Sequence, residues 1–158
     1  PPKAHPSQFR RILHSLDDIK PGGETDVGTV LHEVAERTKR RGLIILISDL
    51  IDKEEAIASG LQHFRHNNHE VIVFQTLDDA ELTFPYDRLT RFKDMEGAGH
   101  VVTNPKNLRQ KYLDRMQAFT EQIKRDCFQR KISYNLANTT DPYDRFLAAY
   151  LDKRARIG

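Results

Sequence analysis

Hydrophobic and polar positions follow two different periods along the chain, and their alternation predicts an α/β fold. Apolar residues recur at helical spacing over residues 9–16 and 27–35. Two unbroken apolar runs, LIILIS at 43–48 and EVIVFQTL at 70–77, are typical of strands covered on both faces. A further helical pattern at 57–64 lies between these runs. The order strand, helix, strand predicts parallel neighbours in a doubly wound, mostly parallel sheet.

The second half of the chain adds one different unit. Residues 88–94 and 100–103 flank the glycine-bearing segment MEGAG, which predicts a β-hairpin attached to the periphery of the sheet. From Asn104 and Pro105 a long helical pattern keeps one face apolar as far as Cys127. Residues 132–138 then predict a third strand, and a closing helix follows Asp141 and Pro142.

Composition narrows the class of protein. The length of 158 residues suits one domain, and the net charge of +2 gives no reason to expect a nucleic-acid partner. No apolar run approaches the length of about 20 residues that a bilayer crossing needs, so we expect no membrane contact by this segment. The single cysteine, Cys127, excludes an internal disulfide and favours a cytoplasmic location, where we expect it as a buried structural thiol. The chain begins without methionine and is read here as a fragment of a longer protein.

Polar side chains gather at two points that a parallel sheet brings to one rim. Thr25 and Asp26 precede the helical pattern at 27–35, and Ser48, Asp49 and Asp52 follow the first strand. Ligands of open parallel sheets collect beyond the carboxyl ends of the strands, where helix N-termini also point. Hydroxyl and carboxylate oxygens suit Mg²⁺. The simpler alternative is that Thr25 or Asp26 only caps the helix.

The same stretches resemble a known family. GGETDVGTVL at 22–31 followed by LIILISDLID at 43–52 resembles the von Willebrand factor A domain, whose metal-ion-dependent adhesion site uses a threonine at a helix entrance and an aspartate at a strand end. On this resemblance Thr25 and Asp49 are the metal ligands, with Asp26 and Ser48 as supporting or capping groups. The glycine usual after the aspartate is Leu50 here.

A closer resemblance covers nearly the whole chain. RRGLIILISDLID, LTFPYDRLTRFKDMEG, NPKNLRQKYLDRM and DPYDRFLAAYLDKR occur in the order seen in bacterial domain-of-unknown-function family 58, a group with a von Willebrand A-like fold that is commonly encoded beside MoxR-type AAA+ ATPases. The Asp-x-Ser-x-Ser strand that supplies the other metal ligands is absent. Residues 1–158 are therefore interpreted as one partial domain, incomplete on its N-terminal side, with Mg²⁺ or Mn²⁺ expected in the intact protein and little or none in this segment.

The resemblance implies a protein–protein interaction module rather than an enzyme. Its expected partner is a MoxR-type AAA+ ATPase or a client of one, in complex assembly or chaperone work. The alternative from another class is a metal-dependent phosphohydrolase that uses the same rim. Loss of the neighbouring strand also predicts that 43–48 forms an open sheet edge, through which copies of the chain self-associate.

Three histidines, His63, His66 and His69, recur every three residues and invite comparison with a zinc site. Two consecutive asparagines end the predicted helix before His69, so His69 does not share a helical face with the other two histidines. We therefore expect solvated surface histidines.

Overall fold

The computed structural model describes residues 5–20, 26–93 and 99–157. Its main sheet has three parallel strands, β1 (Leu43–Ser48), β2 (Glu70–Leu77) and β5 (Ser133–Asn138), in the order β1-β2-β5. In this register Ser48 lies beside Gln75, and Gln75 lies beside Leu136. The carboxyl ends of all three strands therefore meet at one edge.

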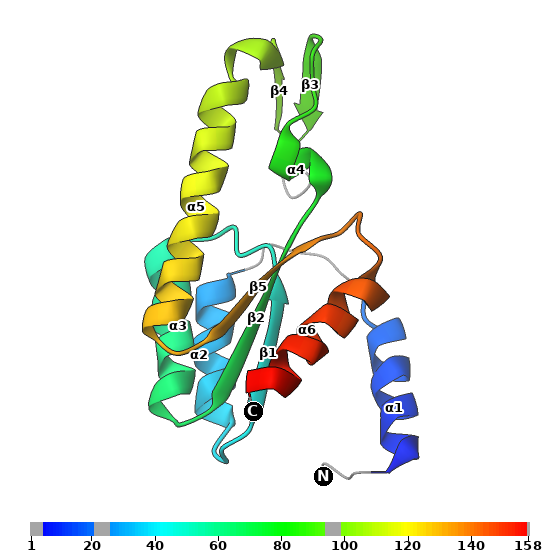
Figure 1. Ribbon diagram of the computed structural model, residues 1–158, viewed down its shortest axis with the longest axis vertical. Coiled ribbons are helices and arrows are strands. Elements are labelled where there is room, and N and C mark those ends of the chain that lie inside the picture. Colours follow the sequence, from blue (N-terminus) through cyan, green and yellow to red (C-terminus); the bar gives the residue numbers. More distant parts are fainter. Residues whose placement is uncertain (1–4, 21–25, 94–98, 158) are drawn as a thin grey trace.

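Helices cover both faces of this sheet (Figure 1). On one face α2 (Val27–Arg37), α3 (Glu54–His66) and the second half of α5 (Arg109–Gln129) enclose the core. On the other face α6 (Tyr143–Ile157) packs Phe146 and Tyr150 edge-on against Phe74 of β2. The predicted α/β class with a mostly parallel sheet is confirmed.

Two glycines let α2 and α3 approach closely. A Cβ at Gly28 would lie 2.5 Å from the Cβ of Ala56, and a Cβ at Gly60 would lie 2.6 Å from that of Leu31. Both distances are far below van der Waals contact, so each position requires the absence of a side chain. The start of α2 is thereby fixed against α3, the helix that follows the loop after β1.

The predicted hairpin is present as β3 (Thr90–Lys93) and β4 (His100–Thr103), paired antiparallel. It stands with α4 (Asp79–Thr83) and η1 (Pro105–Asn107) beside the first half of α5, beyond the carboxyl ends of the main sheet (Figure 1). In α5 only Ile123 and Cys127 are buried, both in its second half. The apolar face that the sequence predicts along the whole helix thus meets the main core only in its second half, where Phe119 also packs against the buried residues.

One prediction of local structure is wrong. Strand β1 is not covered on both faces, because Leu43, Ile45 and Ile47 are 48%, 52% and 66% exposed. The helix that the spacing over residues 9–16 predicts is present as α1 (Pro6–Asp17), and it buries none of its residues although the spacing is amphipathic. Nothing in the part of the chain described here covers either apolar surface.

The expectation of three surface histidines is also wrong for two of them. His69 is fully buried, and it accepts a hydrogen bond from Gly42 N–H through Nδ1 while Nε2 faces the carbonyl of Thr38 at 3.1 Å. It therefore joins the start of β2 to the loop before β1. His63 is partly buried, with its Nδ1 3.2 Å from Nδ1 of His32 on α2, and only His66 is exposed.

Within the described ranges no helix is long and apolar enough to cross a bilayer.

Candidate functional site at the end of β1 and the start of α2

The loop that leaves β1 is a tight turn built by its own side chains. The Oγ of Ser48 accepts a hydrogen bond from Leu50 N–H at 3.1 Å, and Oδ1 of Asp49 accepts one from Ile51 N–H at 3.1 Å. Leu50 has φ of 60°, in the left-handed region. This conformation costs about 1–2 kcal/mol for a residue with a side chain. The Leu50 side chain is fully buried, which contributes about 1.5–3 kcal/mol and offsets that cost.

Leu50 occupies the place where the von Willebrand A pattern has glycine. The backbone adopts the left-handed conformation that glycine takes freely, and it does so with leucine because the core holds the side chain. The departure from the pattern at this position therefore leaves the left-handed turn in place.

The turn reaches the start of α2 through Asp52. Its Oδ2 accepts hydrogen bonds from Val27 N–H at 2.8 Å and Gly28 N–H at 3.4 Å, and its Oδ1 accepts one from Lys53 N–H. The first N–H groups of a helix have no partner within the helix, and a carboxylate there also meets the positive end of the helix dipole. Asp52 thus links two sequence stretches that lie 25 positions apart.

Asp26 is the N-cap residue of the same helix, α2. Its carboxylate accepts hydrogen bonds from Thr29 N–H at 2.8 Å and from Thr29 Oγ1 at 2.9 Å. The backbone hydrogen bond, followed by the hydroxyl hydrogen bond, holds the pKa of Asp26 below its ordinary value. Both oxygens are engaged by Thr29, so Asp26 acts here as a helix cap.

The buried side-chain amide of Gln75, on β2, holds the backbone of the loop that follows β1. The Nε2 of Gln75 donates to the carbonyl of Asp49 at 3.0 Å, and its Oε1 accepts from the Tyr134 hydroxyl of β5 at 2.7 Å. Burial raises the pKa of Tyr134 to about 12, which keeps this phenol a donor at any physiological pH. Gln75 is fully buried, and the three residues tie together all three strands just below the rim.

The predicted site residues fall into three groups. Thr25 lies outside the described residues. Ser48 and Asp26 are used in local turns and caps, although Ser48 also lies 3.4 Å from Oδ1 of Asp49. Oδ2 of Asp49, an exposed residue, accepts no hydrogen bond from any described residue. Sequence reasoning placed Asp52 at the rim but missed its hydrogen bonds to the start of α2. It missed Gln75 altogether, although a polar residue within an apolar strand is a visible signal.

As a metal site, the described part of this rim is incomplete. Mg²⁺ takes six oxygen ligands, several of them waters, and usually one or two carboxylates. No group of three or more acidic, histidine or cysteine side chains able to hold a metal occurs among the described residues. Since Asp52 is committed to α2, Asp49 is the carboxylate that the loop can still offer.

A hollow of about 760 Å³ opens beside the rim. Ile51 and Asp52 of the loop line it, and residues of α5 between 112 and 125 make up most of its lining. Its charged groups have both signs, with Glu54 and Glu81 opposite Arg115 and Arg125. A wide open groove lined by mixed charges is suited to a polypeptide surface more than to a small substrate, which needs an enclosed, mainly apolar pocket.

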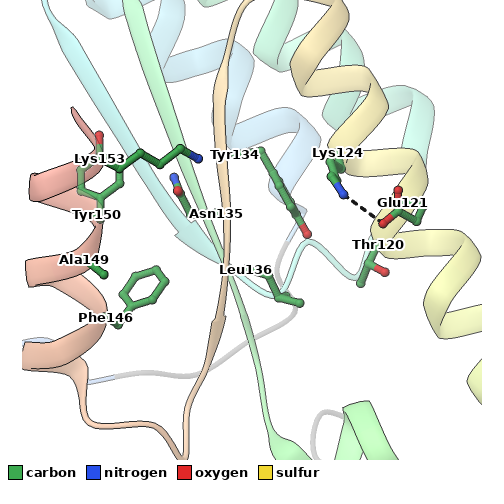
Figure 2. Close-up of a pocket in the computed structure, with 10 residues that line it drawn as sticks. All are labelled: Thr120, Glu121, Lys124, Tyr134, Asn135, Leu136, Phe146, Ala149, Tyr150 and Lys153. Carbon is green, nitrogen blue, oxygen red and sulfur yellow. Dashed lines mark hydrogen bonds and ion pairs between the residues drawn. The ribbon is translucent and has the colours of Figure 1, made fainter. Parts of the chain in front are cut away.

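A second hollow, of about 400 Å³, lies at the other edge of the sheet. Figure 2 shows Tyr134 on the α5 side of β5, with Lys124 and Glu121, and Phe146 and Tyr150 on the α6 side. The hollow therefore follows the free edge of β5 and is separate from the rim.

Cys127, near the end of α5, is fully buried, as predicted. Burial raises the pKa of its thiol to about 12. A thiol so protonated and enclosed is a packing group, not a nucleophile.

Comparison with known families places this chain. A family model described as "Protein of unknown function DUF58" matches residues 1–122. The chain belongs to the DUF58 family. The match covers α1 to the middle of α5 and includes both stretches that form the rim. Neither a curated protein nor a solved structure gives a significant match to this DUF58 chain.

Proposed function

We propose that the rim formed by the loop after β1 and the start of α2 is a protein-docking surface, and that this DUF58 chain is part of an interaction module rather than an enzyme. The observation that carries the proposal is the hydrogen bond from Val27 N–H to Asp52. It joins the two stretches to which the von Willebrand A resemblance assigns an adhesion-type site.

The state of the rim supports this proposal. Asp49 is exposed and keeps one carboxylate oxygen available to a partner, while Gln75 holds its backbone from below. A docking group that is fixed before the partner arrives loses little conformational entropy on binding. The rim therefore presents a fixed acidic group beside an open groove.

In this proposal the metal ion binds to the intact protein. Asp49 and Thr25 would contribute two oxygen ligands to Mg²⁺ or Mn²⁺, with residues outside this sequence supplying the others. Two ligands, one of them neutral, compete poorly with the hydration shell of Mg²⁺, so this segment alone is expected to bind it weakly. Asp26 and Ser48 would support the loop and the helix cap, as their hydrogen bonds indicate.

The proposed partner is a MoxR-type AAA+ ATPase or one of its clients, in the cytoplasm. Support for the partner comes from membership of the DUF58 family and from the resemblance to ATPase-associated members. The single cysteine is the support for a cytoplasmic location.

The experiment is a binding measurement with the intact protein that contains this chain. Immobilised MoxR-type ATPase is titrated with the wild type, with Asp49→Ala and with the control Asp152→Ala, a loss of the same charge at an exposed position on α6. We expect binding in Mg²⁺ that EDTA and Asp49→Ala both abolish and that Asp152→Ala leaves unchanged. Equal binding by all three proteins, with or without EDTA, would remove the proposal.

The phosphohydrolase alternative is tested in the same preparation. The intact protein with Mg²⁺ or Mn²⁺ is incubated with generic phosphoesters, and no turnover is expected. Turnover that Asp49→Ala abolishes would favour the enzyme over the interaction module.

We further propose that this chain self-associates through β1. Among the described residues β1 pairs only with β2, so its other edge is unpaired, and three apolar side chains lie exposed on one face. Such an edge is a template for another strand. Multi-angle light scattering should show a concentration-dependent dimer that Ile45→Lys dissolves and Val102→Lys, on the hairpin, does not. A monodisperse monomer at high concentration would contradict this.

A further inference from the structure

The hairpin and the first half of α5 form a projecting unit with a small core of its own. We call this unit, residues 84–93 and 99–116, the arm. Phe84, in the left-handed conformation with φ of 46°, is only 7% exposed and stacks on Tyr112 with ring centroids 4.4 Å apart. Phe92 of β3 is also stacked with Phe84, with ring centroids 5.8 Å apart, and Tyr86 meets both Phe84 and Phe92 edge-on. The rings fix the hairpin against α5.

The aromatic cluster does not fill the space between the hairpin and the helix. A hollow of about 450 Å³ remains, and we call it the arm hollow. The aromatic residues Phe84, Phe92 and Tyr112 line it together with the aliphatic Val101 and Leu108. Val101 is 62% exposed and Leu108 is 43% exposed. A concave surface lined by exposed apolar side chains favours binding of another apolar group, because binding removes both apolar surfaces from water.

Two cations are part of the lining of the arm hollow. Lys111 and Arg115 lie one turn apart on α5, both line the hollow, and both are exposed. No described residue forms a salt bridge with either of them. Their charge is therefore available to a binding partner.

The stretch of sequence that spans the arm also carries the whole positive excess of the protein. Residues 84–116 contain seven Lys or Arg and four Asp or Glu, an excess of three positive charges, while the complete chain has a net charge of only +2. Charge concentrated in this way steers partners of opposite sign towards the arm.

We propose that the arm hollow docks an acidic polypeptide segment that carries a large apolar side chain. The apolar side chain enters the hollow between Val101 and Leu108, and flanking carboxylates meet Lys111 and Arg115. This mode combines an anchor in an apolar pocket with charge pairing at its rim.

A nucleic acid fits these observations less well. Single-stranded bases bind by stacking on exposed aromatic faces. Here Phe84 is stacked on Tyr112 and Phe92, both partly buried, and the most exposed apolar side chains of the lining are the aliphatic Val101 and Leu108. A protein segment with an apolar side chain matches such a lining.

The arm hollow also continues into the groove beside the rim. Tyr112 and Arg115 line both hollows, and the larger one extends to Ile51 and Asp52. One partner could thus contact the rim and place an acidic segment in the arm. The docking itself uses side chains of the arm alone and needs no metal, so it goes beyond the proposed function and stands or falls separately.

The test uses the full 158-residue chain and three labelled peptides of equal length, measured by fluorescence polarisation. The first carries a central Phe-Leu pair flanked by Asp and Glu, the second replaces the acids with Lys, and the third replaces Phe-Leu with Ala-Ala. We expect the first to bind, with and without EDTA, and the other two to bind at least about tenfold more weakly. Perturbed amide signals of the wild type should lie in α5 and the hairpin.

Variants then locate the site. Lys111→Glu/Arg115→Glu should weaken binding of the first peptide at least about tenfold, and Val101→Ser should weaken it about threefold without a charge change. The control Lys39→Glu/Arg40→Glu makes the same charge change at the opposite end of the sheet and should have no effect beyond a small loss that salt removes. Any one of three results would overturn the proposal. The three peptides could bind equally, or the control variant could lose as much binding as Lys111→Glu/Arg115→Glu. The third such result is that an oligothymidine binds more tightly than the first peptide and depends on Lys111 and Arg115. Loss of binding in EDTA alone would tie the peptide to the metal rim instead.

Discussion

The buried contact between Gln75, Asp49 and Tyr134 makes the sharpest prediction about what holds the rim. Gln75→Leu keeps the size of the side chain and removes both hydrogen bonds, to the Asp49 carbonyl and from the Tyr134 hydroxyl. A buried polar group left without a partner costs about 1–3 kcal/mol. Tyr134 is half-buried, and water can reach its hydroxyl, so the cost of leaving that hydroxyl without Gln75 lies at the lower end of this range. We expect Gln75→Leu to lower the free energy of unfolding by about 2–4 kcal/mol.

Tyr134→Phe has a smaller effect because it leaves only Oε1 of Gln75 without a partner, at a cost of about 1–2 kcal/mol. In the double variant the Tyr134 hydroxyl and Oε1 of Gln75 are both gone, and only the Asp49 carbonyl is left unsatisfied. The double variant should therefore be more stable than the sum of the single effects predicts, by about 1–3 kcal/mol.

Urea unfolding followed by far-ultraviolet circular dichroism measures all four proteins. The coupling energy of this double-mutant cycle is the decisive quantity, because it cancels the separate effects of each substitution. A coupling energy within about 0.5 kcal/mol of zero would show that Gln75 and Tyr134 act independently, and it would refute the reasoning that they hold Asp49 as one unit.

Three further predictions concern the same region and the core. Asp52→Ala should cost about 1–2 kcal/mol in urea unfolding, because two helix-start amides lose their acceptor, whereas Asp152→Ala should cost almost nothing; equal effects would contradict the cap. Gly28→Ala should lower the free energy of unfolding by about 1–3 kcal/mol because its Cβ would clash with α3, and a gain in helix propensity of up to about 1 kcal/mol offsets part of this loss. The control Gly42→Ala should be close to neutral in the same assay, because the nearest atom to its Cβ would lie 3.8 Å away. The Cys127 thiol, with its pKa raised by burial to about 12, should resist an aromatic disulfide reagent in the native protein and react once urea unfolds it; rapid native labelling would contradict its burial.

The regular elements were predictable because local residues mark them. Strands β1 and β2 begin and end where the apolar runs do, and α2 starts at Val27, directly after its cap Asp26. The short helix α4 was missed because it holds only five residues and its sequence gives no periodic signal. The cap of α1 is His5, which accepts a hydrogen bond from Ser7 N–H, a role that no sequence pattern marks.

Tertiary contacts left no trace of this kind in the sequence. The bond between Val27 and Asp52 joins residues 25 positions apart, and no periodicity encodes such a pair. The burial of His69 depends on a carbonyl and an amide of a distant loop, so counting helical turns gave the wrong result. The left-handed backbone at Leu50 is likewise set by the core that encloses its side chain. Residue types and spacing thus predicted which stretches form the rim, and the contacts that join them came only with the structure.

Amide hydrogen exchange at Val27 tests most directly whether the strand end and the helix entrance share one rim. The first amide of a helix has no partner within the helix, so its protection here depends on Asp52. We predict that Val27 N–H exchanges slowly in the wild type and in Asp152→Asn, and much faster in Asp52→Asn. Exchange of Val27 at the rate of an unprotected amide in the wild type would contradict the account.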